Sequence, residues 1–137
     1  MKVSNWKECI ESNSVIKISP DKGKSNSLLE TSIGRIDFLN EIIVKNKTSN
    51  YIFESYYISI LELLHAIVLL KGYKIQNHIC LGFYIKEILG REDLFRIFDD
   101  LRFKRNSLTY YGKRMDFETS KYAISESIKL IELLKIF

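Results

Sequence analysis

The segment "RNSLTYYG", which begins at Arg105, puts a cation where a helix should carry an apolar side chain. Leu94, Phe98, Leu101, position 105 and Leu108 follow one another at intervals of four, three, four and three residues, which is the spacing of one helix face. A guanidinium is permanently charged, and burying it without a partner is very costly. The helix that contains it must therefore supply a counter-charge, an opening to solvent or a bound anion.

Three arrangements would satisfy this arginine. It could pair inside the protein with an acid such as Glu54, Glu62 or Glu87. The helix could instead project beyond its neighbours, so that the guanidinium lies in solvent. In the third arrangement the apolar stripe lines a cleft, for example at a dimer seam, where arginine can bind phosphate in a forked geometry.

The residues around Arg105 favour the cleft. Asn106 and Tyr110 are four residues apart and share a helix face beside Arg105 and Thr109. Guanidinium, carboxamide, hydroxyl and phenol groups with further cations form a plausible contact set for phosphate and bases. The alternative is a basic helix end that complements its own dipole. The candidate RNA or nucleotide contacts are Arg102, Lys104, Arg105, Asn106, Thr109, Tyr110, Tyr111, Lys113 and Arg114.

The two histidines fit structural roles better than catalytic ones. His65 lies among leucines, as a core or interface histidine would, and His78 follows a capping Asn77 and can pack or hydrogen-bond at a helix start. The pattern His78-x-Cys80 has no further ligand nearby, so no metal site is predicted. No phosphate-binding glycine loop and no Ser-His-Asp spacing is present in the sequence, and we predict no cofactor.

Composition indicates one globular domain of 137 residues, with 46% hydrophobic and 28% charged residues. A single proline and six glycines leave the chain free to form long helices. The net charge of +4 is compatible with nucleic acid without requiring it. Cys9 and Cys80 show no framework spacing, which favours two free thiols and a cytoplasmic location.

The most hydrophobic segment, residues 51–70, predicts a central core helix. It carries Glu54, Glu62 and His65, so we expect it to be too polar for a bilayer and predict no membrane location. The amino-terminal residues have charges every few positions and no apolar run, which excludes a signal peptide in this part of the sequence.

Hydrophobic periodicity and capping residues predict the elements. We expect a short helix over residues 4–12 capped by Ser4, an extended piece over 14–19, and helices over 25–45, 49–71, 78–89, 91–111 and 116–137. Ser49 or Asn50 should cap helix 49–71, Asp116 should cap the last helix, and Gly112 should end helix 91–111. The apolar stripe of helix 49–71, with Tyr56 nearer the surface, is Phe53, Tyr57, Ile60, Leu64 and Ile67. The fold class is therefore all-α, an antiparallel bundle of four to six helices. Residues 1–24 would form a short helix and loop that pack on or precede the bundle, and residues 25–137 would form the bundle itself.

Part of this sequence resembles a known family. The stretch "LRFKRNSLTYYG" is similar to the motif region of the HEPN superfamily, whose hallmark is an arginine, commonly followed by asparagine, and a histidine after four to six residues. The "GYK…H" turn upstream and the final helix are also similar in layout, so the resemblance covers about residues 50–137. It implies a HEPN-like helical bundle, homodimerisation through the motif helix, and RNA-directed roles. Many members are metal-independent endoribonucleases of toxin–antitoxin or defence systems.

The chain departs from this motif at one decisive position. The fifth residue after Arg105 is Tyr110, where the family pattern places histidine. A phenol, with an ordinary pKa of about 10, is a poor general base at neutral pH. If Arg105 and Tyr110 form a catalytic pair, we therefore expect weak ribonuclease activity or binding alone.

Two other functions remain open from the sequence. The protein could be the interaction or scaffold half of a toxin–antitoxin-type pair whose partner is a nucleotidyltransferase-like protein, with tyrosine hydroxyls as acceptors. It could also be a bundle that binds no ligand and pairs Arg105 internally.

Overall fold

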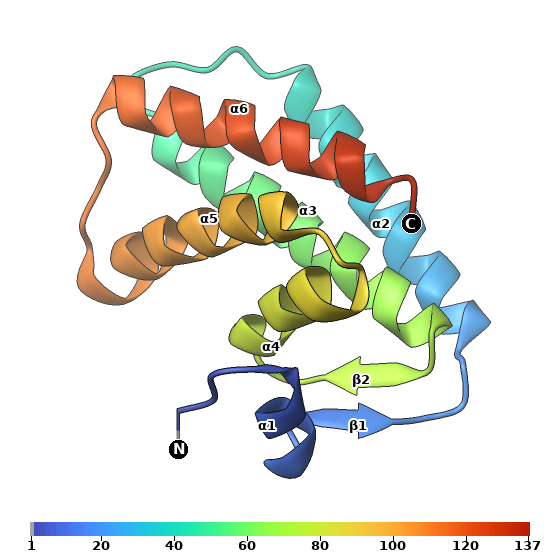
Figure 1. Ribbon diagram of the computed structural model, residues 1–137. Helices are drawn as coiled ribbons and strands as arrows, with labels where there is room; N and C mark the ends of the chain where they lie inside the picture. Colours follow the sequence, from blue (N-terminus) through green and yellow to red (C-terminus); the bar gives the residue numbers. More distant parts are fainter. Residues whose placement is uncertain (1) are drawn as a thin grey trace.

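The computed structural model describes residues 2–137 and confirms an all-α bundle (Figure 1). Within these residues six α-helices, one π-helical segment and one pair of short strands follow one another along the chain. Their order is α1 (Trp6–Glu11), β1 (Val15–Lys17), α2 (Lys22–Asn40), α3 (Ser49–Leu70), β2 (Tyr73–Ile75), α4 (His78–Phe83), η1 (Tyr84–Ile88), α5 (Glu92–Tyr111) and α6 (Phe117–Leu134).

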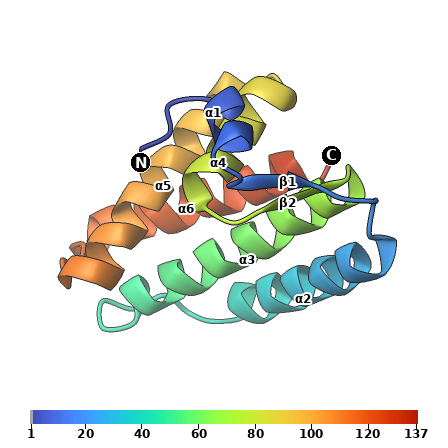
Figure 2. The same cartoon turned by 90° about the horizontal axis from the view of Figure 1, so that it is seen from below.

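The short extended piece expected near residue 15 is strand β1. It pairs antiparallel with β2, with Val15 opposite Ile75, and the two strands lie side by side next to α3 (Figure 2). The sequence contains no signal for this partner because β2 is only three residues long. Gly72, which precedes β2, has a positive φ of 88°, and its backbone carbonyl accepts a hydrogen bond from the N–H of Ile18. The amino-terminal segment is therefore attached to the bundle through backbone pairing.

Cys9 and Cys80 form a disulfide, so the prediction of two free thiols is wrong. The bond joins α1 to α4, with 6.0 Å between the two Cα atoms. The two cysteines are separated by 71 positions, and only the packing of α1 against α4 brings them together. The disulfide removes the free thiols on which the expectation of a reducing cytosol was based.

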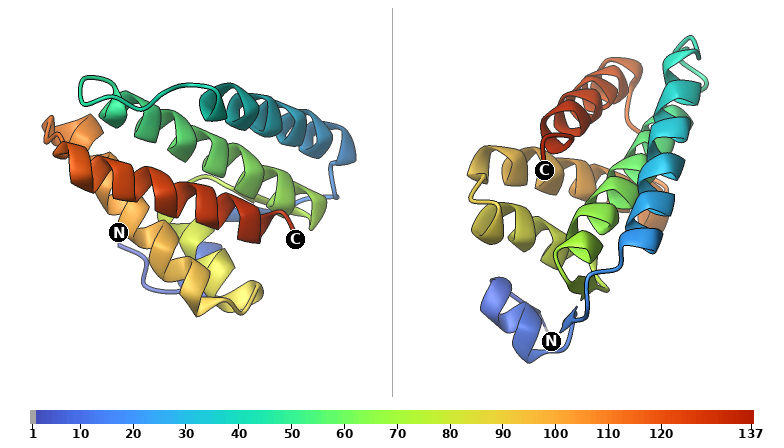
Figure 3. Two further views of the ribbon diagram at one scale, coloured as in Figure 1. Left: turned by 90° about the horizontal axis from the view of Figure 1, so that it is seen from above. Right: turned by 90° about the vertical axis from the view of Figure 1, so that its right-hand side faces the viewer.

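Helix α3 is the centre of the protein. Its predicted stripe of Phe53, Tyr57, Ile60, Leu64 and Ile67 is buried. Helices α2 and α6 lie alongside α3, and α5 contacts both α3 and α6 (Figure 3). Burial on several sides explains why this helix has the highest apolar content in the chain.

Length and composition alone do not exclude residues 51–70 from a bilayer, so the expectation of no membrane location stays a prediction. Helix α3 is long and apolar enough to cross a bilayer, and among residues 2–137 it is the one helix that meets this test. However, 67% of its most apolar stretch is buried inside the protein. The core of the bundle therefore accounts for its hydrophobicity.

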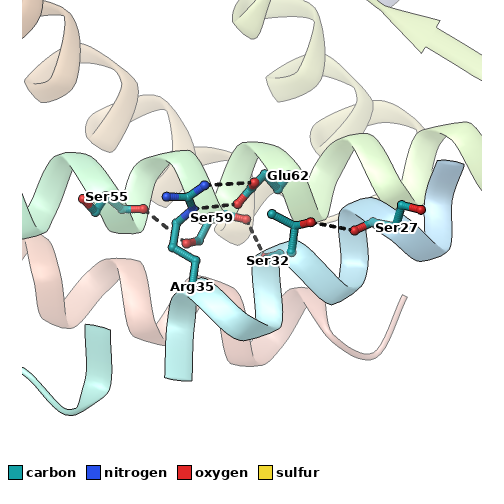
Figure 4. A network of polar contacts seen from close by, with 7 residues as sticks. Ser27, Ser32, Arg35, Ser55, Ser59 and Glu62 are labelled. Carbon is teal, nitrogen blue, oxygen red and sulfur yellow. Dashed lines mark hydrogen bonds and ion pairs between the residues drawn. The ribbon is translucent and has the colours of Figure 1, made fainter. Parts of the chain in front are cut away.

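A polar seam joins α2 to α3 (Figure 4). The Ser32 hydroxyl donates to the carbonyl of Ser59 at 2.8 Å, and Ser32 is fully buried. One turn further along, Arg35 donates to both carboxylate oxygens of Glu62, at 3.0 and 3.3 Å. A buried hydroxyl bond and an ion pair therefore link α2 to α3 along this seam.

Several element boundaries differ from the predictions. Asn5, in place of Ser4, caps α1 through a hydrogen bond from the Glu8 N–H. Helix α2 ends at Asn40, five residues before the predicted end, and Ile43 is exposed. The π-helical segment η1 replaces the second half of the predicted helix 78–89.

Two predicted caps are confirmed. Asn77 accepts from the N–H of Cys80 at the start of α4, and Asp116 accepts from the N–H of Thr119 at the start of α6. The predicted stop of α5 is also confirmed, because Gly112 adopts the left-handed conformation directly after Tyr111.

The start of α3 is used differently from the prediction. Thr48 occupies the cap position, and Asn50 is buried as the second residue of the helix. The Asn50 carboxamide donates to the carbonyl of Met115 and accepts from its N–H, both at 3.0 Å. Tyr56, expected near the surface, is buried and donates to the Asn40 side chain at 2.6 Å.

Candidate functional site

Arg105 is half-buried on the apolar face of α5, next to three fully buried residues of the same stripe, Leu94, Phe98 and Leu101. Its guanidinium carbon lies 5.6 Å from the centre of the Tyr57 ring. It also lies 5.5 Å from the Tyr110 ring, and Nη1 donates to Asn106 Oδ1 at 3.4 Å. None of the salt bridges within residues 2–137 includes this arginine.

The three acids considered as internal partners all make other contacts. Glu54 accepts from the Thr109 hydroxyl at 3.1 Å, and Glu62 pairs with Arg35. Glu87 accepts from the N–H of Trp6 at 2.8 Å. The hypothesis of an internally paired Arg105 is therefore wrong. The guanidinium is held against aromatic faces, which attract a cation without neutralising it.

Arg105 lies instead at an open cavity of about 310 Å³, which we name the Arg105 cavity. The carboxyl-terminal half of α5 forms one wall, and the segment that leads into α4 forms the other. Four of the predicted contact residues meet there with four residues that the sequence did not indicate. The lining residues are Gln76, Asn77, His78, Ile79, Arg102, Arg105, Asn106 and Tyr110.

His78 is the most informative addition to this cavity. Its Nδ1 lies 3.2 Å from the hydroxyl of Tyr57, which is fully buried on α3. Among residues 2–137 no protein group bonds Nε2, and no buried side-chain nitrogen lacks a partner, so Nε2 is open to solvent. The structure thus places an imidazole beside Arg105, although the family-type position at 110 holds tyrosine.

Burial and charge set the protonation of this pair. Burial, followed by the charges of Arg105, His65 and Arg102, lowers the pKa of His78 from its usual 6.5 to about 4. Burial also raises the pKa of the Tyr57 phenol. At pH 7 the imidazole is therefore neutral and the phenol keeps its proton. In the tautomer with the proton on Nδ1, the Nδ1–H group donates a hydrogen bond to the Tyr57 hydroxyl oxygen. The lone pair of Nε2 is then free to accept a proton.

The cavity has an excess of hydrogen-bond donors over acidic groups. Arg102 pairs with Asp99 at 2.8 Å, within its own helix, whereas Arg105 has no carboxylate partner among the described residues. Side-chain amides of Gln76, Asn77 and Asn106 also line the cavity. Such an arrangement can bind an anion, and the planar guanidinium matches a phosphate group.

The structure separates the other predicted contact residues from this cavity. Lys104 lies on the side that faces α6, pairs with Asp100 at 2.7 Å and approaches the ring of Tyr122. Thr109 faces α3 through its bond to Glu54. The remaining predicted contacts are exposed at and after the end of α5 and do not line the cavity; they are Tyr111, Lys113 and Arg114.

Sequence reasoning missed His78 because its position next to Arg105 depends on how α4 packs against α5. The available signal was a capping Asn77 followed by a first-turn histidine, which is equally typical of an ordinary helix start. Cys80, the other residue of the considered metal pattern, is in the disulfide and does not offer a free thiolate. Within residues 2–137 no three His, Cys, Asp or Glu side chains gather as metal ligands.

Comparison of the chain with protein-family models, with curated proteins and with solved structures found no match. The residues that line the Arg105 cavity come from α5, from the start of α4 and from the segment before it, and only the fold brings them together.

Proposed function

We propose that this protein is a HEPN-like domain that binds RNA through phosphate groups at the Arg105 cavity and cleaves it slowly. The observation that carries the proposal is a half-buried Arg105 with no carboxylate partner among the described residues, beside the open Nε2 of a neutral His78. The three acids that the sequence offered as internal partners are engaged elsewhere, so the guanidinium has donors available for a bound anion.

The binding role follows from the donor set. Arg105 and Asn106 can donate to the non-bridging oxygens of a phosphodiester. Tyr110 is 67% exposed at the rim of the cavity and offers a ring face on which an unpaired base can stack. Phosphate contacts and stacking are both tolerant of sequence, so we expect weak base preference.

The cleavage role would use His78 in place of the motif histidine. Nε2 takes the proton of the ribose 2′-hydroxyl, the 2′-oxygen bonds to phosphorus, and the bond to the 5′-oxygen breaks. The leaving oxygen takes a proton from water, which gives a 2′,3′-cyclic phosphate and a 5′-hydroxyl. Because an imidazole with a pKa of about 4 is a weak base, the reaction should be slow. A bound phosphodiester offsets the charge of Arg105, which raises the pKa of His78 and strengthens the base.

Arg105→Ala should weaken the binding of labelled single-stranded RNA by about 10- to 100-fold, the range for losing hydrogen bonds between charged groups. The dependence of log K on log salt should fall by about 0.7, since one phosphate contact is lost. Fluorescence anisotropy at several salt concentrations measures both. Arg96→Ala removes the same charge from an exposed position of α5 and should change neither beyond a small screening effect. Equal affinities of the two variants would contradict the proposal.

A protein-docking role is the second candidate, and exposed aromatic side chains on α5 favour it. Phe103, Tyr110 and Tyr111 are 69%, 67% and 74% exposed. Such a surface fits a second copy of the chain in a homodimer, or a nucleotidyltransferase-type partner that would use a tyrosine hydroxyl as acceptor.

This second candidate predicts a nucleotide adduct on Tyr111 when the protein is co-expressed with a nucleotidyltransferase encoded beside it. The phenol oxygen would bond to the α-phosphorus of a nucleoside triphosphate, and pyrophosphate would leave with the phenol proton. Intact-mass spectrometry should show the added nucleotide on the wild type and not on Tyr111→Phe. Tyr51→Phe is the matched control, because Tyr51 is also exposed but lies on α3. An adduct together with absent RNA binding would favour the docking role over the RNA role.

A further inference from the structure

A second cavity, of about 230 Å³, lies between α2, α3 and β2, and we name it the lysine cavity. Its polar lining residues are Lys24 from α2, His65 from α3 and Lys74 from β2. The rest of the lining is apolar and consists of Leu28, Val68, Leu69 and Ile75. Two ammonium groups and an imidazole thus surround an apolar floor.

The two lysines have no acidic partner. Within residues 2–137 neither Lys24 nor Lys74 takes part in a salt bridge, and no Asp or Glu lines the cavity. The carboxylate of Asp21 accepts from the backbone N–H of Lys24. Glu62, three residues before His65 on α3, is paired with Arg35 and does not line the cavity. The lysine cavity is therefore electropositive, and an anion is the ligand that its charges suit.

The lysine cavity and the Arg105 cavity are neighbours. Lys74 and Ile75 line the first, and the next residues along the chain, Gln76 and Asn77, line the second. Asn77 is three positions after Lys74 along extended chain, roughly 10 Å, or about three repeats of a stacked nucleotide strand. The two cavities are also coupled electrostatically, because Lys24 contributes to the lowered pKa of His65 and His65 contributes to that of His78.

We propose that the lysine cavity is a second phosphate subsite, which binds the same RNA strand that occupies the Arg105 cavity. This inference depends on the proposed function and extends it to a substrate class, single-stranded RNA of several nucleotides. Lys24 and Lys74 donate to a phosphate, and the apolar floor contacts the adjoining ribose or base. A base can reach such a floor only when it is unpaired, so duplex RNA should bind poorly.

The test compares a long and a short probe on variants of each cavity. The long probe is a labelled oligouridylate of about eight nucleotides, which can span both cavities, and the short probe is a uridine dinucleotide. The double substitution Lys24→Ala and Lys74→Ala removes both ammonium groups from the lysine cavity. Lys47→Ala with Lys129→Ala removes the same charge from exposed positions elsewhere and is the control. All four lysines are exposed, and equal melting temperatures would show that the folds are unchanged.

The double substitution Lys24→Ala and Lys74→Ala should lower the affinity for the long probe at least 10-fold relative to the control. The slope of log K against log salt concentration should fall by about 1.4, because two phosphate contacts are lost. The affinity for the dinucleotide should stay within about twofold of the control. If the lysine variant and its control bind the long probe equally while Arg105→Ala weakens both probes, the second subsite is wrong and the proposed function stands. If the wild type binds neither probe, both proposals fail.

Discussion

His78→Asn is expected to lower kcat for RNA cleavage by about 10²–10⁴-fold, the usual contribution of a general base. The KM should change little, because Arg105 and Asn106, which we propose hold the phosphate, are still present. Asparagine retains a polar group that can reach the Tyr57 hydroxyl, the partner of Nδ1 in the wild type. The variant therefore removes the proton acceptor with the least disturbance to the cavity wall.

The pH profile distinguishes this role from a structural one. His78 must be unprotonated to accept a proton, so kcat/KM of the wild type should fall as the pH decreases through about 4, its pKa in the free protein. The His78→Asn profile should lack this acidic limb. The lowered pKa also means that the unfolded chain binds a proton first, so stability falls between about pH 6.5 and 4. Melting temperatures at each pH are therefore needed to confirm that the protein is folded.

A contaminating nuclease is the main alternative explanation of any weak cleavage. Wild type, His78→Asn, Arg105→Ala and the exposed control Arg96→Ala should be purified in parallel and assayed by gel electrophoresis of a labelled RNA. Activity that persists unchanged in His78→Asn, or the absence of cleavage by the wild type, would contradict the proposed chemistry and leave only the binding role.

Reduction of the Cys9–Cys80 disulfide is expected to lower the free energy of unfolding by about 2–4 kcal/mol. The bond closes a loop of 71 positions, and such a cross-link restricts the unfolded chain. This is a large part of the total for a domain of this size, typically about 5–15 kcal/mol. Urea denaturation with and without dithiothreitol measures the difference.

The control for this prediction is Cys9→Ala with Cys80→Ala, whose stability should not respond to the reductant. Both cysteines are fully buried, so the wild type in its two redox states is a cleaner comparison than wild type against the double variant. Two reactive thiols in the denatured but unreduced protein, or equal urea midpoints with and without reductant, would disprove the disulfide's contribution.

The helices could be predicted from sequence because their determinants are local. The apolar stripe of α3, the caps at Asn77 and Asp116, and the stop of α5 before Gly112 each depend on residues within a few positions of one another. The short hydrogen-bonding range of a helix makes such patterns readable. Predictions at helix ends were wrong where a residue contacts a distant part of the chain. Asn50, for example, hydrogen-bonds the backbone of Met115 and does not cap α3.

The unusual position of Arg105 was likewise visible in the sequence, because helical spacing puts it on an apolar face. The groups that surround its guanidinium could not be predicted from the sequence. Glu62 and Glu87 are equally plausible partners on paper, and only the packing shows that Arg35 and Trp6 already occupy them. The same holds for the disulfide, whose cysteines lie on two short helices that meet only in the folded chain.

The amino-acid sequence by itself determined that this protein is helical and that one cation is placed among apolar residues. The tertiary structure alone decided that His78 and Arg105 share a cavity and that Lys24 and Lys74 line the next one. The physical reason is that helix formation depends on neighbours along the chain, whereas a binding site depends on distances across it. Those distances are set by how the helices pack, which no local pattern records.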